Sequence, residues 1–103
     1  MAERLFQIGG EIDLTSASGL QACLNAAVGD DDADLLIDCG DLTYIDETGI
    51  SILAAAQRRL QAEGRSLRVV NANLVTARAI SIRGLAEFLR VNEQTDSGLA
   101  NLR

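Results

Sequence analysis

One short apolar run limits the fold of this 103-residue chain more than any other feature. Residues 34–39 (DLLIDC) place Leu35, Leu36 and Ile37 in succession, so both faces of an extended segment would be apolar here. A strand with two apolar faces is typical of a parallel sheet, in which neighbouring layers cover it on both sides. Since a helical pattern follows this run, it indicates an α/β fold.

Strand-like and helical segments alternate along the rest of the chain. Short apolar or alternating segments are predicted as strands at 4–12, with a bend at Gly9-Gly10, and at 34–39, 66–70 and 88–91. Apolar residues at helical spacing predict helices at 20–28, from Asp46 to near Gly64 and at 74–82, and a terminal helix at 96–102. This order predicts one α/β domain over 1–103, with a mixed, mostly parallel β-sheet of four to five strands and about four helices.

The same periodicity predicts which side chains face the core. In the central and following helices these positions are Ile50, Leu53, Leu60, Val75, Ala79 and Ile82. Cys23 and Cys39 also fall on predicted core positions, so we expect two buried, reduced thiols. A redox-switch disulfide between them is the alternative. Because the chain has two cysteines and no histidine, a zinc site is not expected.

Composition narrows the class of partner. The net charge is −6, from 15 acidic and 9 basic residues, and every basic residue is arginine. Arginine without lysine suggests a GC-rich, bacterial genome. An acidic chain lacks the clustered positive charge that binds nucleic acid, whereas it suits a basic protein surface. No apolar run approaches the roughly 20 residues of a membrane span, and the start lacks a signal-peptide pattern, so we expect a cytoplasmic protein.

The sequence lacks most of the motifs that mark common catalytic sites. Without histidine there is no Ser-His-Asp triad, and neither phosphate-binding glycine motif is present. The carboxylates of Asp38, Asp41 and Asp46 could form a magnesium site, but acidic residues in loops at strand ends are common. We therefore expect a binding protein that is not an enzyme and holds neither a metal nor a cofactor.

The start of the central helix is the strongest candidate for a functional surface. Asp46 stands where a side chain can cap the helix by accepting the N–H of Thr48 or Gly49. Glu47 follows in the first turn, where the helix dipole favours a negative charge by roughly 0.3–1 kcal/mol. Thr48 and Gly49 are expected to keep this end small and open. An ordinary acidic helix start is the alternative interpretation.

Residues 41–53 (DLTYIDETGISIL) resemble the signature of STAS domains, the fold of the anti-sigma factor antagonists. Further stretches similar to the family follow its order, GEID at 10–13, LLID at 35–38 and the helix at 75–85 that ends in Gly-Leu. The resemblance covers roughly residues 5–95. It implies a protein that binds a kinase-type anti-sigma factor, a serine kinase, and so frees a sigma factor. In such proteins the partner phosphorylates the Ser or Thr after the signature Asp, which breaks the complex.

The sequence departs from this pattern at the switch position. The residue after the signature Asp is Glu47, which has no hydroxyl to phosphorylate, and Thr48 would take that role only by a shift of one residue. A phosphoryl group brings a charge of about −1.5 to −2, whereas a carboxylate brings about −1. One hypothesis is that Glu47 fixes the domain in a state like the phosphorylated one. The other, which we favour, is that the partner binds constitutively.

Helix periodicity and the resemblance together predict the partner-binding residues. They come from the loop after the first strand and from the central helix, namely Asp13, Thr15, Asp46, Glu47, Thr48, Gly49 and Ser51, with Arg58 or Arg59 as a charged rim. One alternative function is the STAS subunit of a lipid-transport ABC assembly, which docks on its ATPase. Another is a small-ligand or nucleotide binder.

The first predicted strand raises the question of self-association. STAS domains commonly carry an extra short strand before the Gly-Glu-[Leu/Ile]-Asp stretch, and nine residues ahead of Gly10 leave little room for it. The resemblance therefore predicts an exposed sheet edge. Such an edge can pair with a second copy, so a homodimer is a further expectation.

Overall fold

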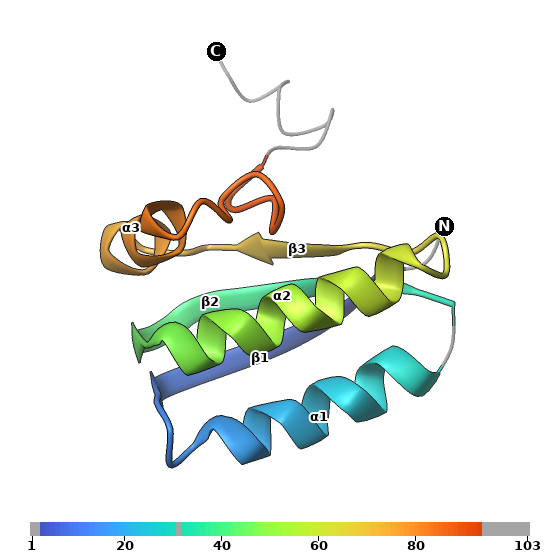
Figure 1. Ribbon diagram of the computed structural model, residues 1–103, viewed down its shortest axis with the longest axis horizontal. Helices are drawn as coiled ribbons and strands as arrows, with labels where there is room; N and C mark the ends of the chain where they lie inside the picture. The colour runs from blue at the N-terminus through green and yellow to red at the C-terminus, as the bar shows by residue number, and fades with distance from the viewer. Residues whose placement is uncertain (1–2, 31, 94–103) are drawn as a thin grey trace.

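The computed structural model describes residues 3–30 and 32–93 of the chain. Its elements are β1 (Glu3–Ile12), α1 (Ala17–Asp30), β2 (Asp34–Ile45), α2 (Glu47–Gln61), β3 (Leu67–Val70) and α3 (Leu74–Ile82). The strands form one parallel sheet in the order β1-β2-β3, and α1 and α2 pack side by side on it (Figure 1). The α/β fold is confirmed, although the described residues form three strands where four to five were expected.

The segment predicted as a strand at 88–91 is a series of turns. It does run beside β3, because the N–H of Val69 donates to the carbonyl of Leu89 at 3.1 Å and the N–H of Asn92 donates to that of Val69 at 2.7 Å. Arg90 and Asn92, however, have φ angles of +52° and +55°, which an extended strand does not contain. The helix predicted at 96–102 lies outside the described residues.

Strand β2 is longer than predicted, since it continues through the segment interpreted as a turn and approach at 40–45. β1 follows it along this extension and ends with Ile12 opposite Ile45. The pairing is irregular between Gln7 and Gly9 and again between Gly10 and Glu11, and Gly10 has a φ of +71°. The predicted bend is thus confirmed, and it lets the two strands end together beneath the start of α2.

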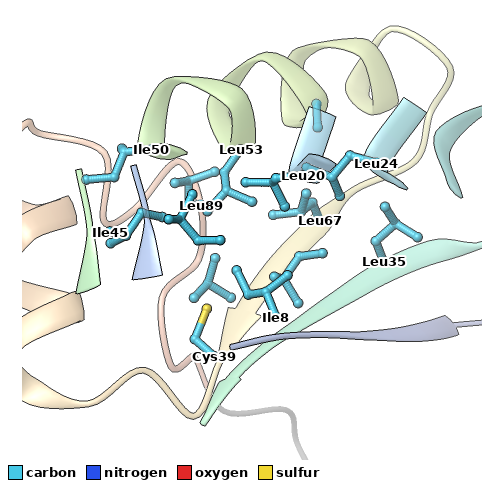
Figure 2. Packing of buried hydrophobic residues seen from close by; sticks show 14 of the residues in the cluster. Ile8, Leu20, Leu24, Leu35, Cys39, Ile45, Ile50, Leu53, Leu67 and Leu89 are labelled. Carbon is cyan, nitrogen blue, oxygen red and sulfur yellow. The ribbon is translucent and has the colours of Figure 1, made fainter. Parts of the chain in front are cut away.

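The hydrophobic core lies between the sheet and the two long helices. The predicted core positions Ile50, Leu53 and Leu60 are buried, at 1%, 0% and 0% exposure. Figure 2 shows how both layers contribute to the cluster, with Ile8, Leu35, Cys39, Leu20, Leu24, Ile50 and Leu53 among its labelled members. Leu36 points to the opposite face of the sheet and is only half-buried, so the apolar run is fully covered on one face alone.

A buried amide joins the layers. Gln57 of α2 is fully buried, and its Oε1 accepts the N–H of Leu67 at 2.7 Å. Its Nε2 donates to the carbonyl of Leu67 at 2.9 Å and to that of Phe88 at 2.7 Å. One side chain therefore holds α2, β3 and the turns after α3 in place.

The prediction that both cysteines face the core was wrong for one of them. Cys23 is exposed, because α1 turns Leu20, Leu24 and Ala27 inward and leaves position 23 on the outer side. Cys39 is buried as predicted, and burial, followed by the nearby charge of Asp38, raises the pKa of its thiol to about 12. Both cysteines are free thiols, one on the surface and one in the core.

The prediction of the inward face of α3 was wrong for Val75 and Ile82, although Ala79 is partly buried against the core and the bounds of the helix were right. The buried residues of α3 are Thr76 and Ile80, while Val75 and Ile82 are 66% and 76% exposed. The cap of the helix is also bonded to the sheet. Asn73 accepts the N–H of Thr76 at 2.8 Å and also donates to the carbonyl of Leu42 at 3.3 Å, which ties the helix start to β2.

The outer edge of β1 has no neighbouring strand within the described part of the chain. Homodimerisation through this edge stays a prediction, which a dimeric mass in solution would support and a monomeric mass would contradict. Among the described helices, none has the length and apolar character needed to cross a membrane.

Candidate functional site

Helix α2 begins where β1 and β2 end, at the carboxyl edge of the sheet (Figure 1). Asp46 has an extended backbone, and its Oδ1 accepts the N–H of Gly49 at 3.1 Å, so it is the predicted N-cap. The N–H of Asp46 donates to the carbonyl of Ile12 at 3.0 Å. The helix start is therefore fixed to the ends of both strands.

Gly49 has a packing role that the sequence interpretation missed. It is buried, and a Cβ atom at this position would lie 2.7 Å from Ile12 Cγ2 and 2.7 Å from Ile45 Cγ1. Thr48 and Gly49 were expected to keep this end of the helix small and open, and the structure places Gly49 in the interior instead of on the surface. Because a Cβ at these distances would force Ile12 or Ile45 to shift, Gly49 lets the first turn of α2 rest directly on the two strand ends.

Glu47 projects from the first turn and is paired with a base from another helix. Its side chain is 72% exposed, and its Oε1 lies 3.6 Å from Nη2 of Arg83, the residue at the end of α3. Arg83 was not among the predicted site residues. No local pattern marks it, because the pair depends on the way α3 folds back toward the start of α2.

Two surface grooves meet at Glu47 and Thr48, which line both. The α1–α2 groove has a volume of about 580 Å³ and is also lined by Ser51, Arg58 and Gln21. The structure thus gathers the predicted residues Glu47, Thr48, Ser51 and Arg58 along one groove. Of the two candidate rim residues, Arg58 lines it, whereas Arg59 donates to the side chain of Asn25 on α1 at 2.7 Å.

The second groove, the α2–α3 groove, has a volume of about 550 Å³. Beside the start of α2, its walls include Tyr44, Ala79, Ile82 and Arg83. None of these was predicted to contact a partner. Tyr44, which is 48% exposed, belonged to the resembling signature, but nothing in the pattern distinguished it from its neighbours.

Asp13 and Thr15 lie at the same edge of the sheet, in the loop between β1 and α1, but neither lines these two grooves. Asp13 Oδ1 accepts the hydroxyl of Thr15 at 2.7 Å and the N–H groups of Thr15 and Ser16 at 3.0 and 3.2 Å. These bonds, the Thr15 hydroxyl first, hold the pKa of Asp13 below its usual value. Asp13 therefore shapes the turn ahead of α1, and its contact with a partner stays a prediction.

The acidic residues considered for magnesium do not converge. Asp38 accepts the N–H of Gly40 at 2.8 Å and the amide of Asn71 at 3.2 Å, and these two bonds lower its pKa. Over residues 3–30 and 32–93, no group of three or more acidic or cysteine side chains is placed to hold a metal ion. The arrangement at the start of α2 instead presents polar and charged groups outward, as a binding surface does.

Comparisons with known proteins agree with this geometry. Residues 3–98 match the family model of the STAS domain. The chain is 32% identical over 101 residues to the anti-sigma-F factor antagonist RsfB of Mycobacterium tuberculosis, covering 96% of this chain and 80% of the relative. It is 29% identical over 92 residues to the anti-sigma-B factor antagonist of Bacillus subtilis, covering 89% and 84%. The solved structure of the anti-sigma factor antagonist SpoIIAA in its unphosphorylated form has the same fold, with a TM-score of 0.77 at 15% identity over 97% of this chain and 86% of that chain.

Proposed function

This chain belongs to the STAS domain family, and from that premise we propose that it is an anti-sigma factor antagonist acting in the bacterial cytoplasm. It binds a kinase-type anti-sigma factor and releases the sigma factor that this partner holds, without catalysing a reaction itself. The observation that carries the proposal is the exposed start of α2, fixed by the Asp46 cap in a chain 32% identical to RsfB. The α1–α2 groove beside it supplies carboxylate, hydroxyl and guanidinium groups from Glu47, Thr48, Ser51 and Arg58.

We further propose that binding is constitutive, because Glu47 is a poor copy of a phosphorylated side chain. A phosphoryl group adds a charge of about −1.5 to −2 and three acceptor oxygens. Glu47 carries one carboxylate, and Arg83 lies 3.6 Å away to offset its charge. The repulsion that phosphate would direct at a partner is therefore weaker here, and a partner adapted to this carboxylate can approach the helix start.

The decisive experiment measures the affinity of the purified chain for the anti-sigma factor encoded in the same genome. Wild type, Glu47→Ser and Glu47→Gln are compared by titration calorimetry. Constitutive binding predicts a tight wild-type complex and changes of less than about tenfold, or 1.4 kcal/mol, in the variants. Glu87→Ser is the matched control, since it removes an exposed carboxylate outside both grooves. Tight binding that appeared only after substitution of Glu47 would contradict constitutive binding.

Thr48 requires a separate test, because it carries the hydroxyl nearest to the family's switch position. The chain is incubated with the anti-sigma factor and radiolabelled ATP, and the Thr48→Ala variant is treated in parallel. We expect no label on wild type. Label that is present on wild type and absent from Thr48→Ala would show a shifted phosphorylation site and would contradict the proposal that Glu47 replaces the switch.

The lipid-transport alternative predicts a different partner. A pull-down from the native cell, with the bound proteins identified by mass spectrometry, separates the two functions. Recovery of an anti-sigma factor supports the proposal, and recovery of a transporter ATPase in its place would overturn it. The named relatives, both of them anti-sigma factor antagonists, favour the first outcome.

A further inference from the structure

Helix α3 exposes apolar side chains that the rest of the fold does not use. Leu74, Val75 and Ile82 are 76%, 66% and 76% exposed, although α3 has only nine residues. Single exposed apolar residues are common on protein surfaces and need no explanation. Several on one short helix form a contiguous patch, and such patches mark contact surfaces.

These side chains border a shallow groove along the helix. Leu74, Val75, Arg78, Ala79 and Ile82 line a space of about 360 Å³, and we call these five residues the α3 surface. Ala79 and Ile82 also line the α2–α3 groove, whose other wall includes Glu47. The α3 surface is therefore continuous with the start of α2, and one partner can cover both.

The charge of the α3 surface is opposite to that of the whole chain. Arg78 is exposed and forms no ion pair with any residue that the structure describes, and α3 contains no acidic residue. The chain as a whole has a net charge of −6. An apolar patch with one available guanidinium suits a partner segment that carries both apolar side chains and a carboxylate.

We propose that the α3 surface docks an acidic amphipathic segment of the protein partner. Apolar side chains of that segment cover Leu74, Val75 and Ile82, and a carboxylate pairs with Arg78. A second copy of this chain is a poorer occupant, because a two-fold contact through this face would bring two Arg78 side chains into one interface. The identity of the partner, an anti-sigma factor, rests on the proposed function. The segment would extend its contact from the start of α2 onto α3.

The test uses the full chain and the anti-sigma factor encoded in the same genome. Ile82→Ser and Arg78→Glu are each expected to weaken the complex by about tenfold or more, and Arg78→Gln by less than Arg78→Glu. Leu5→Ser is the matched control, because Leu5 is a 59% exposed leucine on β1, away from α3. The affinity of this variant for the anti-sigma factor should stay at the wild-type value. All substituted side chains are on the surface, so circular dichroism should show unchanged folding.

The outcomes separate this inference from the function on which it rests. Wild-type affinity in both Ile82→Ser and Arg78→Glu, with a complex still formed, would overturn the α3 surface and leave the proposed function standing. A wild-type chain that failed to bind the anti-sigma factor would overturn the proposed function itself, and with it the partner named here. A wild-type dimer that Ile82→Ser converted to a monomer would identify a second copy as the occupant and would also overturn the inference.

Discussion

The carboxylate of Glu47 lies 3.6 Å from the guanidinium of Arg83, so one ion pair links the start of α2 to the end of α3 across the α2–α3 groove. The pair stands where the STAS resemblance predicts a phosphorylatable hydroxyl. Surface pairs of this kind contribute little to stability, since water and salt screen them. The pair therefore matters less for the stability of the fold than for the surface charge at the start of α2.

The first prediction concerns this charge. Arg83→Gln leaves the Glu47 carboxylate without its counter-charge. The negative charge at the start of α2 then becomes more like that of a phosphorylated side chain, and the affinity for the anti-sigma factor should fall several-fold. In a Glu47→Ser background the same Arg83→Gln change should have almost no effect, because the charge it exposes is gone. Titration calorimetry on the four proteins gives this double-mutant cycle. Equal losses in both backgrounds would mean that Arg83 contacts the partner directly.

The second prediction concerns the buried amide of Gln57. Gln57→Leu removes the partner of the N–H and carbonyl of Leu67 and of the carbonyl of Phe88. Unsatisfied buried polar groups cost about 1–3 kcal/mol each, and three groups lose their partner here, so we expect a loss of about 3 kcal/mol or more in the free energy of unfolding, measured in urea. Gln61→Ala, at an exposed position of the same helix, should change it by less than about 0.5 kcal/mol.

The elements that the sequence predicted well are those decided by near neighbours. The cap at Asp46 and the inward face of α2 follow from residues three or four positions apart, and the structure has both. The bend at Gly9-Gly10 is equally local. In each case the residues that carry the signal lie within one short stretch of the sequence, so their spacing is sufficient information.

The elements that were missed depend on residues far apart in the chain. The bond from Asn73 to the carbonyl of Leu42 ties the start of α3 to β2, and no pattern within 74–82 contains it. Arg65 is another case, since it is buried and donates to the carbonyls of Val28 and Ala33 at 2.6 and 2.9 Å. Sequence alone favours an exposed arginine at such a position. The Glu47–Arg83 pair was missed for the same reason.

The third prediction tests the contact of α2 with the strand ends. Gly49→Ala places a methyl group 2.7 Å from side-chain atoms of Ile12 and Ile45, and overpacking of this kind costs about 1–3 kcal/mol. Thermal unfolding should show the loss, and affinity for the partner should fall with it if the helix start shifts. Gly19→Ala in α1 meets nothing within 4 Å and should leave stability unchanged or raise it. Equal stability in the two variants would contradict the close contact.

The fourth prediction distinguishes the two thiols. Cys23 is exposed, whereas burial raises the pKa of Cys39 to about 12, so its reactive thiolate is scarce at neutral pH. A thiol reagent such as Ellman's reagent should label one cysteine in the native chain and both in denaturant. Cys23→Ser should abolish the native labelling, and Cys39→Ser should leave it. Rapid native labelling of Cys39 would contradict its position in the core.

The fifth prediction follows from Asp13. The hydroxyl of Thr15, with the backbone N–H groups of Ser16 and Thr15, holds the pKa of Asp13 below its unfolded value of 3.8. A carboxylate with a lowered folded pKa stabilises the fold above the unfolded pKa, and this contribution disappears as the pH falls through the folded pKa. Asp13→Ala should therefore lower the free energy of unfolding at about pH 7 and have a smaller effect at about pH 2.5. Thr15→Val removes the largest cause of the shift and should weaken this pH dependence. If the effect of Asp13→Ala were the same at every pH, the hydrogen bonds would not act by stabilising the charged carboxylate, and the prediction would be wrong.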